Sequence, residues 1–117
     1  MEFKDIVGMT FVSVRNEEDE RIVFEKADGS SHRLYHDQDC CERVTVEDVI
    51  GDLKDLENSP ILSAEESSSD ERPEGWEGFT DDSNEWTFYR ISTIKGYVVI
   101  RWYGSSNGYY STSVSFK

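Results

Sequence analysis

The side chains best suited to chemistry lie in the run His32-Arg-Leu-Tyr-His36-Asp-Gln-Asp-Cys40-Cys41-Glu42. Two imidazoles and two thiolates are a common ligand set for zinc. If residues 31–36 form a strand, however, His32 and His36 are about 13 Å apart, at about 3.3 Å per residue, and cannot bind one ion together. Adjacent cysteines are also poorer joint ligands than a C-x-x-C pair. We therefore expect no metal and no cofactor, and the simpler interpretation is a strand end with one cysteine buried as a small apolar side chain.

The same run could instead supply a nucleophile, with His36 as the base for Cys40 or Cys41. A reactive thiol needs positive charge nearby to favour the thiolate. Most of the neighbouring charges are carboxylates, which act in the opposite direction, and Arg43 is the one nearby base. A metal-binding or thiol-dependent protein centred on His36, Cys40 and Cys41 is therefore kept as the alternative hypothesis. A disulfide between the two neighbours would close a strained ring, so the chain is not a disulfide scaffold.

Other catalytic patterns are missing from the sequence. It contains no P-loop, G-x-G-x-x-G, G-x-S-x-G or H-E-x-x-H pattern. Carboxylates are so numerous that no pair stands out as a general acid and base. We therefore predict a protein that is not an enzyme.

The charge balance narrows the choice of partner. The 117 residues carry 12 Lys and Arg against 25 Asp and Glu, a net charge of −13. This sign argues against direct binding to nucleic-acid phosphates or to an anionic membrane surface, and it favours a basic protein partner. The chain has no apolar run of membrane-spanning length and no signal-peptide pattern at its start, so we expect an intracellular protein.

Much of the negative charge lies between residues 65 and 85, where nine acids stand against the single base Arg72. Serine, proline and glycine residues in this segment predict an irregular acidic loop. One interpretation is a solvated loop that keeps the protein soluble. The other is a docking surface for a basic groove, in which Trp76 is an apolar anchor. The candidate contact residues are Glu65, Glu66, Asp70, Glu71, Trp76, Asp81 and Asp82.

In the first half of the chain the pattern predicts strands over residues 10–15, 21–26 and 31–36. Asp28-Gly29 is typical of a two-residue hairpin turn between the last two strands. Such a turn fixes the pairing of residues across the hairpin. The expected pairs are Val23 with Leu34, Ile22 with Tyr35, and Glu25 with His32.

The middle of the chain predicts a short strand over residues 44–46 and then a helix over residues 47–57. Val49, Leu53 and Leu56 have the spacing of one helix face. Gly51 would weaken that helix by about 1 kcal/mol relative to alanine. A further strand is expected to begin over residues 61–64.

The C-terminal third predicts an antiparallel meander of three strands, over residues 86–94, 97–103 and 109–116, with turns at Lys95-Gly96 and Asn107-Gly108. Both faces of this sheet carry large apolar residues, and the sequence does not indicate which face covers the core. The expected register pairs Tyr89 with Trp102, Ile91 with Ile100, and Arg90 with Arg101. The last pair would place two like charges opposite each other.

Together these patterns predict one α+β domain over residues 1–117. It would consist of an antiparallel β-sheet built as a meander of hairpins, one short helix, and the acidic loop at about 65–85.

Three further motifs carry a resemblance to known proteins: His36-Asp-Gln-Asp-Cys-Cys-Glu42, Trp86-Thr-Phe-Tyr-Arg90 and Arg101-Trp-Tyr-Gly-Ser-Ser-Asn-Gly-Tyr-Tyr110. The sequence resembles a family of small bacteriophage-encoded proteins of unknown function, over most of residues 34–64 and 85–116. The resemblance implies a phage or prophage source and expression in the cytoplasm of a bacterial host. It implies no catalytic residues.

Small acidic phage proteins often inhibit host defence, and some present carboxylates where DNA phosphates would sit. By this analogy the leading hypothesis is a non-enzymatic inhibitor of a basic host protein, such as a nucleic-acid-binding defence complex, in the manner of anti-CRISPR or anti-restriction proteins. A virion assembly component is a further alternative.

Overall fold

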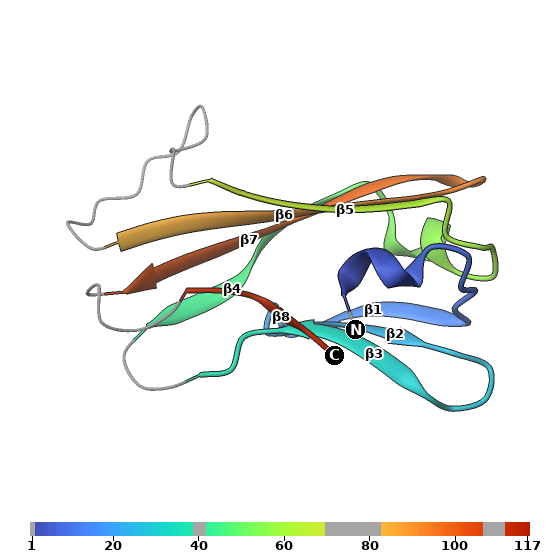
Figure 1. The fold of residues 1–117 in the computed structure, drawn as a ribbon, viewed down its shortest axis with the longest axis horizontal. Coiled ribbons are helices and arrows are strands. Elements are labelled where there is room, and N and C mark those ends of the chain that lie inside the picture. Colours follow the sequence, from blue (N-terminus) through green and yellow to red (C-terminus); the bar gives the residue numbers. More distant parts are fainter. Residues whose placement is uncertain (1, 39–41, 70–82, 107–111) are drawn as a thin grey trace.

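The fold is a sandwich of two antiparallel β-sheets (Figure 1). The computed structural model describes residues 2–38, 42–69, 83–106 and 112–117. One sheet has the strand order β1-β2-β3-β8 and the other has the order β4-β7-β6-β5. The helical segments among these residues are two 3-10 turns of four residues each. The expected α+β class is therefore wrong, and the chain is an all-β protein. None of its helical segments within the described ranges has the length and apolar character needed to cross a membrane.

The described residues form eight strands and two short helical turns. Their bounds are η1 Phe3–Ile6, β1 Ser13–Glu17, β2 Arg21–Glu25, β3 Ser31–Tyr35, β4 Arg43–Ile50, η2 Leu53–Leu56, β5 Ser63–Ser69, β6 Ser83–Thr93, β7 Gly96–Ser106 and β8 Ser115–Phe116.

The expected helix over residues 47–57 is replaced by the second half of β4 and by η2. Five of the eight residues of β4 are β-branched, which favours extended backbone. Gly51 follows with φ of +101°, a conformation that no helix contains. Asp52 then caps η2 by accepting a hydrogen bond from the Lys54 amide at 2.9 Å. Val49, Leu53 and Leu56, whose spacing predicted one helix face, thus lie in two separate elements, β4 and η2.

The hairpin of β2 and β3 forms as predicted, but in a register one residue away from the expected one. The Gly29 amide donates to the Lys26 carbonyl at 3.0 Å, and the Lys26 amide donates to the Ser30 carbonyl at 2.8 Å. Gly29 has φ of +89°, so the loop has three residues and ends in the left-handed region. The additional residue pairs Ile22 with Leu34, and the expected pairs are wrong.

The hairpin of β6 and β7 also forms, with its turn at residues 94–95 instead of 95–96. This changes the register by two, so Tyr89 lies opposite Ile100 and Arg90 lies opposite Val99. The expected Arg90–Arg101 pair is therefore wrong. Arg101 instead pairs with Glu47 of β4, with 2.7 Å between Nε and Oε1. Because a shift of two preserves the alternation of faces, each apolar set still lies together.

The third strand of the expected meander does not continue the sheet in the described residues. The second neighbour of β7 is β4, whereas β8 pairs with β3 in the other sheet. The C-terminus therefore crosses from one layer of the sandwich to the other (Figure 1). This connection links the two layers.

The core fills the space between the two sheets. The face of β6 and β7 that points inward carries Tyr89, Ile91, Ile100 and Trp102, all without solvent exposure. They pack against side chains of the opposite sheet, with Phe3 of η1 placed edge-on to the Tyr89 ring at 4.8 Å between centroids. Each such side chain contributes about 1.5–3 kcal/mol through removal of apolar area from water. The opposite face carries the half-buried Phe88, Val99 and Tyr103, together with the buried Trp86.

Candidate functional site

Two of the predicted contact residues, Glu65 and Glu66, lie in β5. The strand extends to Ser69, so the first residues of the expected acidic loop are paired with β6. The other five predicted contact residues lie outside the described residues. They are Asp70, Glu71, Trp76, Asp81 and Asp82.

Strand β5 forms one edge of its sheet, and its side chains from Glu65 to Ser68 are exposed. Neither Glu65 nor Glu66 forms an ion pair with any residue that the structure describes. Arg90 is the cross-strand neighbour of Glu65, but it donates a hydrogen bond to the Ser67 hydroxyl at 2.8 Å. Charged side chains on an edge strand discourage pairing with another sheet. They also leave this edge with two carboxylates that form no ion pair among the described residues.

A pocket of about 630 Å³ opens beside this edge, between β5, η1 and β8. Its apolar lining comes from Phe3, Ala64 and Phe116, with the two aromatic rings edge-on at 5.6 Å between centroids. Its charged lining residues are three glutamates and one lysine, of which Glu65 lies on the opposite side of β5 from Ala64 and Glu66. The lining residues are Glu2, Phe3, Lys4, Ala64, Glu65, Glu66 and Phe116.

The buried Tyr89 lies next to this pocket, in contact with Phe3. Its hydroxyl interacts with the Glu66 side chain, the cross-strand neighbour of Tyr89. Burial, together with the negative charge of Glu66, raises the pKa of Tyr89 above its ordinary value. The phenol therefore keeps its proton, and it is a donor beside the Glu66 carboxylate.

A second cleft, of about 1020 Å³, lies between the turn after β1, the end of β3 and the start of β4. Its lining includes five acidic residues and three arginines, so its charge is mixed with an excess of acids. The lining residues are Glu18, Asp19, Glu20, Arg21, Arg33, Tyr35, His36, Asp37, Gln38, Glu42, Arg43, Val44, Thr45 and Val46. The Val46 amide donates to the Asp19 carbonyl at 2.7 Å, which ties the two sheets together at this cleft.

The side chains of His36 and Glu42 are buried beside this cleft, with 6% and 0% exposure. The Nδ1 atom of His36 lies 2.7 Å from the Ser113 carbonyl oxygen, so it must carry a proton and donate. Its Nε2 atom lies 3.2 Å from Oε1 of Glu42. One proton can be shared across this second contact, either by an imidazolium or by a neutral carboxylic acid. Both ring nitrogens are therefore occupied, which favours a structural role for His36.

The alternative site is centred on His36, Cys40 and Cys41, and both cysteines lie outside the described residues. The structure therefore gives no distances between His36 and either thiol. The two histidines occupy different surroundings. His32 stacks on Phe116, at 5.7 Å between centroids, whereas His36 contacts Glu42. Within the parts of the chain that are described, no three His, Cys, Asp or Glu residues are grouped as a metal site requires.

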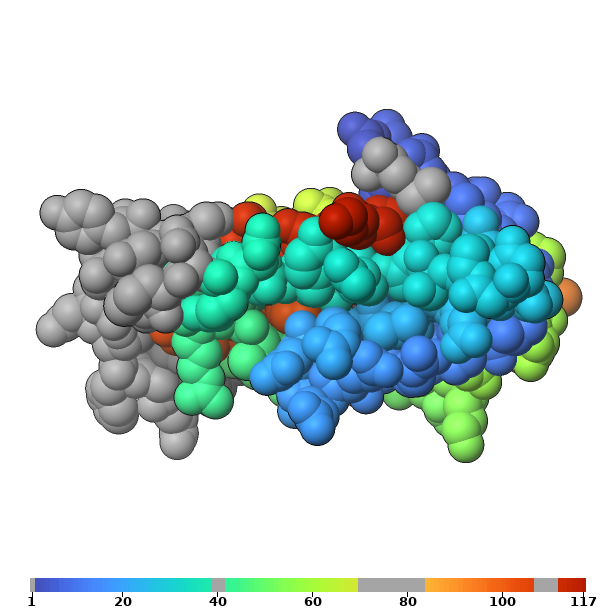
Figure 2. Space-filling view, turned by 90° about the horizontal axis from the view of Figure 1, so that it is seen from below, coloured from blue at the N-terminus to red at the C-terminus, as the bar shows by residue number. Residues whose placement is uncertain are grey.

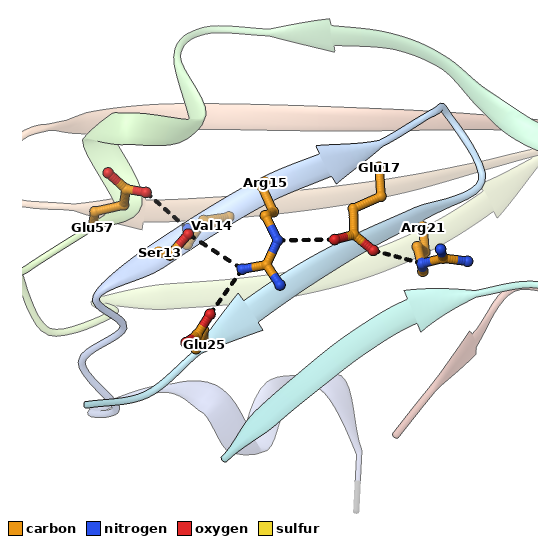
Figure 3. Close-up of polar contacts among 7 residues, drawn as sticks. All are labelled: Ser13, Val14, Arg15, Glu17, Arg21, Glu25 and Glu57. Atoms are coloured by element: carbon orange, nitrogen blue, oxygen red, sulfur yellow. Dashed lines mark hydrogen bonds and ion pairs between the residues drawn. The ribbon is translucent and has the colours of Figure 1, made fainter. Parts of the chain in front are cut away.

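The outer face of the β1-β2-β3-β8 sheet carries a ladder of exposed ion pairs (Figure 2 looks onto these strands, and Figure 3 shows the ladder). The Arg15 guanidinium contacts Glu17 and Glu25, each at 2.9 Å, and Arg21 contacts Glu17 at 2.6 Å. The four charges cancel, so this ladder by itself offers no net attraction to a charged partner. Sequence analysis did not single out these residues, although alternating charges on strands β1 and β2 were a usable signal.

We expect Glu17 to titrate below its ordinary pKa of 4.5, because hydrogen bonds from Arg21 and then Arg15 favour the carboxylate. A lowered pKa in the folded state gives stability that is present above the unfolded pKa and is lost as the pH falls through the folded one. Side-chain NMR titration of the Glu17 carboxyl should show the low midpoint, and the variant R21Q should raise it. An unchanged midpoint in R21Q would refute this assignment.

Comparison with known proteins identifies the family of the chain. The family model described as domain of unknown function (DUF7448) matches residues 4–116. No curated protein and no solved structure matches the chain significantly.

Proposed function

The chain belongs to the DUF7448 family of domains of unknown function, and we propose that it is a non-enzymatic binding protein whose acidic surface engages a basic, nucleic-acid-binding protein. The observation that carries this proposal is the edge strand β5, where Glu65 and Glu66 are exposed and form no ion pair among the described residues. Charge of this kind attracts and orients a basic partner, and it contributes more to the rate and selectivity of association than to affinity.

The distribution of charge supports the choice of this edge. On the outer face of the other sheet, Arg15, Glu17, Arg21 and Glu25 neutralise one another. On β5 no ion pair forms with another described residue, and the sequence continues from Ser69 into Asp70-Glu71. Negative charge thus accumulates toward one edge of a protein whose net charge is −13.

The finer part of the proposal rests on the resemblance to small phage proteins. On this basis the chain would act in the cytoplasm of a bacterial host and inhibit a defence complex by occupying its nucleic-acid groove. Carboxylates on a rigid strand can replace phosphates because both are anionic acceptors for arginine and lysine.

Two charge-matched variants test the proposal. The first, E65Q/E66Q/D81N/D82N, neutralises four of the predicted contact residues. The second, E18Q/E20Q/D37N/D48N, neutralises four exposed acids elsewhere in the described structure. The tagged protein is first used to capture proteins from bacterial lysate at low and high salt. The dissociation constant of the captured protein is then measured for both variants over a range of NaCl concentrations.

We expect capture of a basic nucleic-acid-binding protein that DNA displaces and high salt releases. The first variant should weaken its binding by about tenfold or more and flatten the salt dependence, since about 1.4 kcal/mol of lost attraction is sufficient for this change. The control variant should bind nearly as well as the wild type. Equal weakening by both variants would show an effect of net charge only, and the proposed docking edge would be abandoned.

A further inference from the structure

The pocket beside β5 combines an aromatic lining with a charged one. One wall is apolar and aromatic, from Phe3 and Phe116, and Glu66 adds a carboxylate on the same side of β5 as Ala64. Lys4 is the one base in the lining, and it pairs with Glu2 at 3.1 Å. Because this pair is more than 70% exposed on both sides, it is weak and leaves the pocket with negative charge.

The lining selects among ligand classes. An anion would be repelled by the carboxylates, and a purely apolar group would gain nothing from them. A cation on an apolar stem satisfies both walls, because its stem lies on the aromatic rings and its charged end meets the rim. Arginine suits this arrangement better than lysine, since its planar guanidinium stacks on aromatic rings and binds a carboxylate through two hydrogen bonds.

The Tyr89 hydroxyl fixes the side of the sheet on which Glu66 lies. Tyr89 is buried, and Glu66 is its cross-strand neighbour, so the two side chains share one side of the sheet. The Glu66 carboxylate acts on this hydroxyl through its charge and a side-chain hydrogen bond. Glu66 is therefore held on the same side of β5 as Ala64, which lines the pocket.

We propose that the pocket lined by Phe3, Glu66 and Phe116 receives one arginine side chain of the basic partner. This inference rests on the proposed function, and it specifies which chemical group of the partner is recognised and where. Binding there would place the partner over the pocket formed by β5, β8 and η1, elements whose positions Figure 1 shows.

The test uses the full chain and a pair of blocked tripeptides, acetyl-Ala-Arg-Ala-amide and the same peptide with citrulline in place of arginine. Citrulline has nearly the shape of arginine without its charge. NMR titration of the isotope-labelled protein should show saturable shifts of the amide signals of Phe3, Ala64, Glu66 and Phe116 with the arginine peptide. The citrulline peptide should bind at least about threefold more weakly, as expected for loss of a cation–π contact and an exposed ion pair.

Three variants assign the effect to the pocket. E66Q should lower the affinity for the arginine peptide by about threefold or more. F116L should lower this affinity by about two- to fivefold, because leucine removes the aromatic wall and still fills much of its volume. The control E18Q/E20Q should leave the affinity unchanged. Amide signal shifts elsewhere on the surface, or equal affinities for the arginine and citrulline peptides, would refute the assignment of the arginine site to this pocket.

The captured partner separates this inference from the proposed function. If the partner binds E66Q and F116L as well as it binds the wild type, while E65Q/E66Q/D81N/D82N weakens it, the pocket fails and the acidic docking surface stands. If neither set of changes affects a basic partner, the proposed function fails as well.

Discussion

Replacement of His36 by alanine is expected to lower the free energy of unfolding by about 3–5 kcal/mol, the usual cost of removing one partner from a buried ionisable pair. The imidazole links the buried Glu42 carboxyl to the Ser113 carbonyl, at 3.2 and 2.7 Å. Without it, Glu42 loses this partner while it stays in a site with no solvent exposure. The Ser113 carbonyl, just before β8, loses its donor as well. Urea denaturation followed by tryptophan fluorescence measures the effect.

The variant E42Q is the matched control for H36A. A glutamine has the shape of glutamate and can donate a hydrogen bond to the neutral imidazole, so its cost should be that of one altered hydrogen bond, below about 2 kcal/mol. The two variants should therefore differ clearly. If H36A costs less than about 1 kcal/mol, the pair is not buried as described, and His36 becomes available for the alternative thiol or metal hypothesis.

Replacement of Gly51 by alanine is expected to destabilise the protein by about 2–4 kcal/mol. The backbone there has φ of +101°, for which a residue with a Cβ atom costs about 1–3 kcal/mol. The new Cβ would also lie 2.7 Å from the Tyr97 carbonyl oxygen, a backbone atom that cannot move aside. The sequence-based helix predicts the opposite sign, because alanine in place of glycine stabilises a helix interior by about 1 kcal/mol.

Gly8 provides the control for Gly51. Its φ is +90°, but a Cβ added there would meet nothing within 4 Å. G8A therefore measures the cost of the left-handed backbone alone, and the further loss in G51A measures the overlap with Tyr97. Thermal and urea unfolding of both variants give the comparison. A stabilised G51A protein would exclude the β4–η2 arrangement and restore the helix.

Local pattern located most of the strands of this protein. The aromatic and β-branched runs that became β6 and β7 were recognised, as was the hairpin of β2 and β3, because alternation along a strand is a property of neighbouring residues. Inward and outward faces of β6 and β7 were also grouped correctly. The error in that register was an even number of residues, which leaves every side chain on its own face.

Pairing depended on details that the pattern does not carry. The position of Gly29 in a three-residue loop, instead of a two-residue turn, moved the β2–β3 register by one. The helix over residues 47–57 was predicted because Val49, Leu53 and Leu56 have helical spacing, although Gly51 adopts a backbone that a helix excludes. Among the candidate contacts, the sequence identified the acidic residues but not the aromatic wall beside Glu66. Phe3 and Phe116 come from opposite ends of the chain.

By itself, then, the sequence determined composition, charge and local conformation: a strongly acidic chain, rich in strands, without a recognisable catalytic motif. The tertiary structure decided which strands are neighbours, which face covers the core, and which distant side chains share a pocket. These depend on contacts between residues far apart in the chain, such as β3 with β8 and Asp19 with Val46. Such contacts form only where two apolar faces can be buried together. Whether they can depends on segments that are distant in the sequence, so no single segment determines it.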